Sequence, residues 1–215
     1  LMAPNTPTKR RRREDGERAR AQLLDAAISV IAHGGLSAVS HRAVAIEAGL
    51  APALTTYYFA SKADMIAAAF DRFVERGMDT ISGSWERAFE VLEEHNTNNA
   101  AREKIIGQLT ALTATYIFDE RLHQTDGVAF EIAFLFNPHL DSTLREKVHQ
   151  YRDGMTVTAE KFCRQAGSEH PDTDAALLMG LISRLEFEHM SVAAMLTKSN
   201  AEAQIRRLLE TIIPR

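Results

Sequence analysis

Residues 40 to 62 bring cationic, hydroxyl and aromatic side chains into one short stretch of the 215-residue chain. Arg42 and Lys62 stand near its two ends, and the segment P-A-L-T-T-Y, residues 52–57, lies between them. Guanidinium and ammonium groups bind phosphate oxygens, while hydroxyl and apolar side chains contact base edges in a DNA groove. These residue types could serve recognition of nucleic acid, and the helical pattern of the surrounding residues decides whether they do.

The histidines and carboxylates elsewhere do not form a catalytic or metal-binding pattern. Eight histidines are spread over different segments, and no H-E-x-x-H pair occurs. The run E-F-E-H at residues 186–189 is too compressed to place two helical zinc ligands on one face. Cys163 is the only cysteine, which excludes an intrachain disulfide and a cysteine-based metal cluster. We therefore expect no enzyme, no cofactor and no metal site.

The residues around the cationic stretch predict a helix, a turn, a second helix and the start of a third. Ser40 can cap the first helix by accepting an amide hydrogen bond. Gly49 can adopt the positive φ that a sharp turn requires, and Pro52 suits the first position of the next helix. Ser61 is the expected N-cap of the third helix, with Asp64 three residues later. This order predicts a helix-turn-helix unit.

This segment resembles the N-terminal signature of the TetR family of transcriptional regulators, T-x-R-x-I-A-x-x-A-G-V-S-x-x-x-x-Y-x-Y/H-F-x-x-K. The matching residues, in register without a gap, are Arg42, Val44, Ala45, Ala48, Gly49, Leu50, Tyr58, Phe59, Ser61 and Lys62. Residues 20–36 also resemble the first helix of that family. The resemblance covers about the first third of the chain, and beyond about residue 70 nothing specific remains.

Helix-turn-helix proteins place the second helix in the major groove. The residues that this arrangement predicts at the DNA are Pro52, Ala53, Leu54, Thr56 and Tyr57. The resemblance further implies that Arg42 contacts a base or a phosphate, that Tyr57 packs on the DNA backbone and that Lys62 pairs with a phosphate. We expect Tyr58 and Phe59 to serve the core of the unit.

The chain departs from the family's usual pattern in two places. Ala51 stands where the family commonly has a serine that caps the recognition helix, and losing such a cap costs about 1 kcal/mol. Leu54-Thr55-Thr56 stands where the family commonly has Thr-Leu-Tyr, so Thr55 takes a usually buried position and Thr56 replaces a tyrosine that contacts phosphate. We therefore expect thymine-methyl contacts and DNA shape to carry much of the selectivity.

The whole chain is expected to be all-α, because strand signals are few and apolar residues recur three and four apart. Besides the helix-turn-helix, helices are predicted at about residues 16–33, 101–119, 125–136, 141–166, 172–197 and 200–213, with a long helix from Ser61 into the eighties. The predicted domains are a flexible basic arm at residues 1–15, a helix-turn-helix domain at 16–66 and a helical effector-binding and dimerisation domain at 67–215.

Residues 1–66 carry a net charge of +3 and the remainder −7, which suits a phosphate-facing N-terminal part. The arm either contacts DNA or serves as a solubilising tail.

The last two predicted helices carry wide apolar faces. The residues predicted at a dimer interface are Leu181, Leu185, Val192, Ile205 and Leu209, and Leu177, Ala193 and Met195 widen the apolar surface. A single helix-turn-helix contacts too few base pairs for useful selectivity, so a two-fold partner and a palindromic site are expected. The alternative is that these faces are simply buried within the monomer.

Aromatic residues and methionine between those helices predict an apolar interior. The resemblance implies that a small apolar effector binds there, with candidates Tyr116, Phe130, Glu131, Phe134, Met155, Phe162, Leu185 and His189. The sequence itself supports only a core at these positions.

The function that the resemblance implies is a ligand-responsive repressor that binds its operator as a homodimer, and the alternative is a constitutive DNA-binding or architectural protein without an effector. No apolar run approaches the ~20 residues that span a bilayer, so we expect the protein to be located in the cytoplasm.

Overall fold

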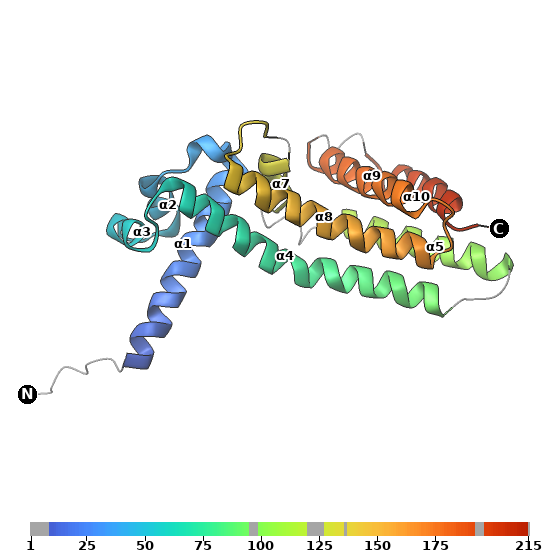
Figure 1. Cartoon of the computed structure of the whole chain (residues 1–215), viewed down its shortest axis with the longest axis horizontal. Coiled ribbons are helices and arrows are strands. Elements are labelled where there is room, and N and C mark those ends of the chain that lie inside the picture. Colours follow the sequence, from blue (N-terminus) through green and yellow to red (C-terminus); the bar gives the residue numbers. More distant parts are fainter. Residues whose placement is uncertain (1–8, 95–98, 120–126, 136, 192–195, 215) are drawn as a thin grey trace, which may run out of the picture. The chain divides into compact units, whose positions relative to one another are not determined.

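The computed structural model describes residues 9–94, 99–119, 127–135, 137–191 and 196–214. Within these residues the chain is helical and contains no strand, which confirms the all-α prediction. The helices (Figure 1) are α1 Lys9–Ala38, α2 His41–Ala48, α3 Pro52–Tyr58, α4 Lys62–Glu93, α5 Asn99–Ile117, α7 Gly127–Leu135, α8 Ser142–Gln165, α9 Pro171–Ser191 and α10 Lys198–Ile212. No helix in this described part is both long and apolar enough to cross a membrane.

Helix α1 is longer than the sequence predicted. It begins at Lys9, so the expectation of a flexible arm is wrong for residues 9–15, while residues 1–8 lie outside the described part. An ion pair of 3.0 Å between Arg13 Nε and Glu17 Oε1, one turn apart, supports this end of the helix. Near the other end Gly35 adopts φ 69° and ψ 180°, which breaks the regular helix where the glycine pair predicted its end.

The described chain divides into two compact units. The first unit comprises Leu1–Glu75 and Ala129–His139, and the second comprises Arg76–Val128 and Leu140–Arg215. Helix α4 contributes its first turns to the first unit and its later turns to the second. The segment 129–139, which contains most of α7, belongs with the N-terminal helices although it lies far along the chain.

The core of the first unit is built from the apolar stripe that the sequence shows in α1. Leu23, Ala27 and Ile31 are fully buried there, because positions four residues apart share one face of a helix. The buried residues that pack around this stripe include Val44, Ala45, Phe59, Met65, Ile66 and Phe70. Phe59 is 3% exposed, as expected for a core residue.

The second unit has a core made by α5, α8, α9, α10 and the later turns of α4. Its most deeply buried members include Ile106, Ala114, Ile117, Ala159, Cys163, Leu185, Ile205 and Ile212. Arg102 of α5 closes one end of this core, because its guanidinium donates to the carbonyl oxygens of Glu210, Ile213 and Pro214 at distances from 2.7 to 3.0 Å. These carbonyls at the end of α10 lack helical partners, so the arginine takes the role of a C-cap.

Candidate DNA-binding surface

The turn between α2 and α3 has the geometry that the sequence predicted. The Oγ of Ser40 accepts a hydrogen bond of 3.1 Å from the amide of Ala43, which caps α2. Gly49 adopts φ 63°, in the left-handed region. The amides of Gly49 and Leu50 then donate to Ile46 and Ala45, which closes α2 before the chain turns into α3.

Helix α3 starts without a side-chain cap, as the alanine at position 51 implied. Ala51 has an extended conformation and makes no capping hydrogen bond, and Pro52 follows it at the first helical position. Thr55 is fully buried, and its hydroxyl donates a hydrogen bond of 2.7 Å to the carbonyl of Pro52. The hydroxyl therefore has a partner within the helix, which explains how a threonine occupies a site that is usually apolar.

The predicted DNA contacts lie on the surface of the unit. The exposed residues of α3 are Pro52, Ala53, Thr56 and Tyr57, and Leu54 is half-buried. Tyr57 is 78% exposed, an unusual fraction for so large an apolar ring. Arg42, in the first turn of α2, is also exposed. The structure therefore leaves all these side chains accessible to a partner.

Lys62 begins α4 and is exposed as well. Its Nζ donates a hydrogen bond of 3.2 Å to the carbonyl of Ser37, near the end of α1. Ser61 precedes it and caps α4, since its Oγ accepts from the amide of Asp64 at 3.0 Å. Lys62 would thus exchange one weak hydrogen bond to a carbonyl for an ion pair when a phosphate approaches.

Two long-range contacts join α1 to α4 and to the end of α2, and sequence reasoning missed them. Arg72 of α4 forms a bidentate pair with Asp25 of α1, with Nε–Oδ1 2.6 Å and Nη2–Oδ2 2.8 Å. The hydrogen bond to Asp25 raises the pKa of Arg72 above its ordinary value, against an opposing effect of burial. Gln22 of α1 donates 2.8 Å to the carbonyl of Ala48 at the end of α2. No spacing in the sequence signals these pairs, because their members lie 26 and 47 residues apart.

The end of α3 is tied to α1 by a further hydrogen bond. The hydroxyl of Tyr58 donates 2.9 Å to the carbonyl of Gly16, and the ring of Tyr58 lies edge-on to that of Tyr57 with centroids 4.9 Å apart. A Cβ on residue 16 would lie 3.2 Å from the Tyr58 oxygen, closer than an ordinary contact. Glycine at this position therefore permits the approach, and Tyr58 has a structural role as expected.

The candidate effector residues are divided between the two units. Phe130, Glu131 and Phe134 are on α7 in the first unit, where Phe130 and Phe134 stack with Phe70 and Phe73 at centroid distances of 4.7 to 6.4 Å. The other five candidates, Tyr116, Met155, Phe162, Leu185 and His189, belong to the second unit. Leu185 is fully buried in its core, and Phe162 packs against the ring of Trp85 at 5.7 Å.

The candidate dimer residues prove to face in different directions. Leu185, Ile205 and Leu209 are at most 2% exposed in the single chain, so they serve the core of the second unit and are not available to a partner. The prediction is wrong for these three, because the apolar pattern does not distinguish the inner stripe of each helix from the outer one. Val192 lies outside the described residues.

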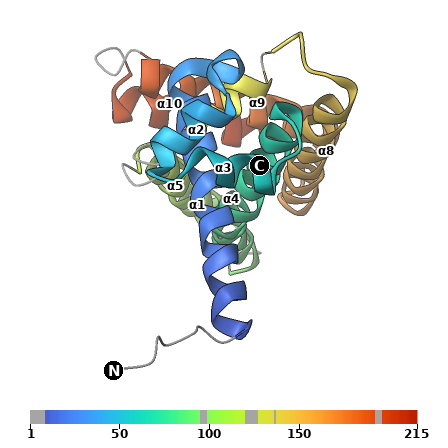
Figure 2. The ribbon, with the colours of Figure 1, turned by 90° about the vertical axis from the view of Figure 1, so that its left-hand side faces the viewer.

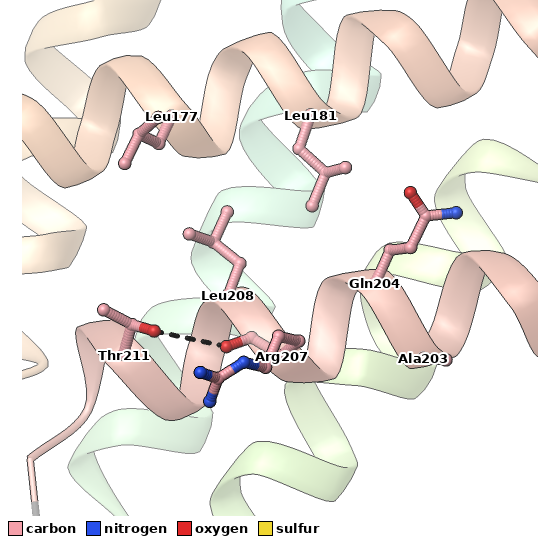
Figure 3. A pocket seen from close by; sticks show the side chains of 7 residues that line it. All are labelled: Leu177, Leu181, Ala203, Gln204, Arg207, Leu208 and Thr211. Atoms are coloured by element: carbon pink, nitrogen blue, oxygen red, sulfur yellow. Dashed lines mark hydrogen bonds between the residues drawn. The ribbon is translucent and has the colours of Figure 1, made fainter.

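Leu181 is different, because it lines an open groove between α9 and α10 (Figure 3). The groove is formed by Leu177, Leu181, Ala203, Gln204, Arg207, Leu208 and Thr211. Leu177 and Leu181 come from α9 and project toward Leu208 of α10. Leu177 is 53% exposed, so this groove presents leucine side chains to solvent. None of the eight candidate effector residues lines it.

Comparison with known proteins agrees with this arrangement. Residues 23–69 match the family model described as bacterial regulatory proteins, tetR family. The matched segment contains α2, α3 and the capping residues of α4 described above. The chain matches no curated protein sequence.

Solved structures share the fold over nearly the whole chain. A transcriptional regulator from Saccharomonospora viridis, in complex with choline, is 20% identical with a TM-score of 0.65, and the match covers 90% of this chain and 96% of that one. A TetR-family member from Streptomyces coelicolor A3 is 22% identical with a TM-score of 0.58, over 92% and 99% of the two chains. The multidrug binding protein EbrR complexed with proflavin is 21% identical with a TM-score of 0.55, over 88% and 99%.

Proposed function

We propose that the chain is a member of the TetR family of transcriptional regulators, since residues 23–69 match that family's model, and that it is a repressor that binds a palindromic operator as a homodimer and is released by a small apolar effector. Members of this family are DNA-binding regulators and not enzymes, as we expected for this chain. The observation that carries the proposal is the α2–Gly49–α3 geometry with the exposed face of α3. We place its action in the cytoplasm, where an operator is accessible.

The proposed DNA contacts divide into two kinds. Pro52, Ala53, Leu54 and Thr56 would meet base edges in the major groove, where apolar groups contact thymine methyls. Arg42, Tyr57 and Lys62 would contact the backbone, with Arg42 also at a base. The exposure of Arg42, Pro52, Ala53, Thr56, Tyr57 and Lys62 supports these roles, and Leu54 is half-buried.

The proposed dimer is formed through the groove between α9 and α10. Leu177, Leu181 and Leu208 expose apolar surface there, and Gln204 and Arg207 supply polar groups beside it. An apolar centre with a polar border is the usual composition of a protein interface. A two-fold interface of four helices, two from each subunit, would cover the leucines and place two copies of α3 on one palindromic site.

The effector would bind within the second unit, among Tyr116, Phe162 and His189. The ring of His189 lies 4.5 Å from that of Phe118, centroid to centroid, and Phe162 packs against Trp85 in the core of the same unit. The similar folds of a protein in complex with choline and of one complexed with proflavin support a ligand-binding role for this chain. Helix α4, which continues from this unit to the first, would carry the response, provided that the effector binds one arrangement better than the other.

The test is a selection of bound duplexes from a random-sequence library, followed by binding measurements with the selected duplex. We expect enrichment of a palindrome and, when a small-molecule library is added, compounds that weaken binding. Enrichment of a palindrome without any active compound would favour the alternative, a constitutive DNA-binding protein. Failure to enrich any sequence would contradict the proposed function.

A further inference from the structure

Arg20 of α1 is an exposed cation that lies outside residues 23–69, the segment that matches the family model. We propose that its guanidinium binds a phosphate of the DNA backbone beside the C-terminal end of α3. The inference rests on the proposed function and adds one contact to those of Arg42, Tyr57 and Lys62. Because a phosphate carries no sequence information, this contact would raise affinity without changing the preferred operator.

The guanidinium of Arg20 is held over an aromatic ring at the end of α3. Its Cζ lies 5.8 Å from the centroid of the Phe59 ring, and Phe59 is the C-cap residue of α3. A cation within about 6 Å of a ring centroid is attracted by the negative face of the ring. Phe59 is itself only 3% exposed, so its packed ring gives the long arginine side chain a rigid support. The positive charge is therefore presented at the end of the proposed recognition helix.

A second contact fixes α1 against the same end of α3. One turn before Arg20, the carbonyl of Gly16 accepts the 2.9 Å hydrogen bond from the hydroxyl of Tyr58. Residues four apart lie on one face of a helix, so Gly16 and Arg20 both face the end of α3, beside which α1 passes (Figure 2). The ring of Tyr58 contacts that of Tyr57, with centroids 4.9 Å apart, and Tyr57 is 78% exposed. Arg20 and Tyr57 thus flank one end of α3, and a DNA strand that packs on Tyr57 would run close to the arginine.

The charge of Arg20 is not neutralised by a carboxylate. Among the residues that the structure describes, none forms an ion pair with it, whereas Arg72 is paired with Asp25 and Arg13 with Glu17. An aromatic ring has no net charge, so it can support a guanidinium and leave N–H donors for a phosphate, which arginine binds through two parallel hydrogen bonds. Binding would break no ion pair. A phosphate oxyanion is therefore a partner whose chemistry fits this side chain.

The alternative is that Arg20 serves only the fold, by covering Phe59 with its methylene groups. Charge separates the two roles, because covering the ring needs an apolar side chain and binding a phosphate needs a cation. The variant Arg20→Met keeps an unbranched apolar side chain over the ring and removes the charge, while Arg20→Lys keeps the charge. The control Arg18→Met removes an equally exposed cation of the same helix. Arg18 lies about 200° around the helix axis from Arg20 and so faces away from α3.

The experiment measures the affinity of the wild-type chain and of each variant for a duplex that the wild-type chain selects from a random library. The salt concentration is varied between about 50 and 200 mM, and the slope of log affinity against log salt is determined. Urea unfolding of each variant reports its stability separately. If Arg20→Met does not fold, Arg20→Gln takes its place under the same criteria.

If Arg20 neutralises one phosphate in each subunit of the dimer, the salt slope should fall by about 1.8 in Arg20→Met. The ratio of wild-type to variant affinity then decreases roughly twelvefold between about 50 and 200 mM salt. Arg20→Lys and Arg18→Met should keep the wild-type slope. A wild-type slope in Arg20→Met, with or without a loss of stability, or an equal fall in Arg18→Met would overturn the proposal. Failure of the wild-type chain to select any duplex would instead contradict the proposed function.

Discussion

The ion pair between Asp25 and Arg72 should stabilise the first unit measurably. Two hydrogen bonds of 2.6 and 2.8 Å join the guanidinium to the carboxylate, and the side chains are 25% and 41% exposed for Arg72 and Asp25. Charge-assisted bonds contribute about 1.5–3 kcal/mol when sheltered, while exposed pairs contribute about 0–1 kcal/mol. Partial exposure places this pair between these limits, so we expect a coupling energy of roughly 1–2 kcal/mol.

The measurement is a double-mutant cycle with Asp25→Asn, Arg72→Met and the combined variant, followed by urea unfolding at one fixed protein concentration. Each single variant should lower the free energy of unfolding by at least this coupling energy, which in a thermal scan corresponds to a fall of roughly 2–8 °C in melting temperature at about 2–4 °C per kcal/mol for a chain of this size. The guanidinium pKa is raised in the folded chain. The contribution from Arg72 is therefore complete below the unfolded pKa and is lost only as the pH rises above it, far outside the neutral range.

A matched control is the pair Glu160 and Arg164, which is one turn apart on α8 with Arg164 66% exposed. Its cycle should give a coupling of about 0.5 kcal/mol or less, as for surface pairs on one helix. If the Asp25–Arg72 coupling does not exceed that of the control, the bidentate geometry does not stabilise the unit and the reasoning from distance and burial fails.

Three further predictions concern the proposed DNA contacts, the dimer and the buried thiol. Lys62→Ala should lower the salt slope of DNA binding by about 0.9 for each phosphate that the lysine neutralises, and it should weaken binding about equally on all sequences. Arg42→Ala should also relax the preference at one base position, and an unchanged slope for Lys62→Ala would remove that lysine from the phosphate-binding residues. Leu181→Glu places a carboxylate in the α9–α10 groove, and light scattering should then show monomers. The control Val157→Glu, at a 65% exposed position on α8, should leave the dimer intact. If the Leu181→Glu variant stays dimeric, the groove is not the interface. Burial, with Asp174 and Glu160 nearby, raises the pKa of Cys163 to about 12 from an ordinary 9.0. The folded chain is therefore favoured below pH 9 and loses stability as the pH rises toward 12, since the unfolded thiol ionises first. Urea unfolding between about pH 8 and about pH 10 should show a smaller loss for Cys163→Ala, and an equal loss would exclude the thiol as the cause.

The local features of the helix-turn-helix could be predicted because each depends on one residue type at one position. Ser40 and Ser61 cap helices through their own side chains, and Gly49 supplies a positive φ that other residues rarely adopt. The sequence also predicted Thr55 as a buried polar residue. These conclusions need no knowledge of which helices meet in space.

The features that sequence reasoning missed depend on contacts between distant segments. A wide apolar face on α9 or α10 does not reveal which stripe is inside, because two neighbouring stripes are both rich in leucine. Leu185 and Ile205 turn inward, while Leu177 and Leu208 line the open groove. The run of cations at the start of α1 predicted a flexible arm because it is too polar to pack, yet arginine is a good helix former and the rest of α1 extends the helix cooperatively.

The aromatic cluster of the first unit bears on how a signal could reach the DNA-binding helices. Phe70 and Phe73 come from α4, and Phe130 and Phe134 come from α7, far along the sequence, yet the four rings form one cluster. The chain passes between the two units at three points, at residues 75–76, 128–129 and 139–140. A packed aromatic cluster resists gradual deformation and tends to change between discrete arrangements. An effector of the proposed kind that altered the chain near residues 128–129 or 139–140 would act on α4 through the packing of α7 against Phe70 and Phe73.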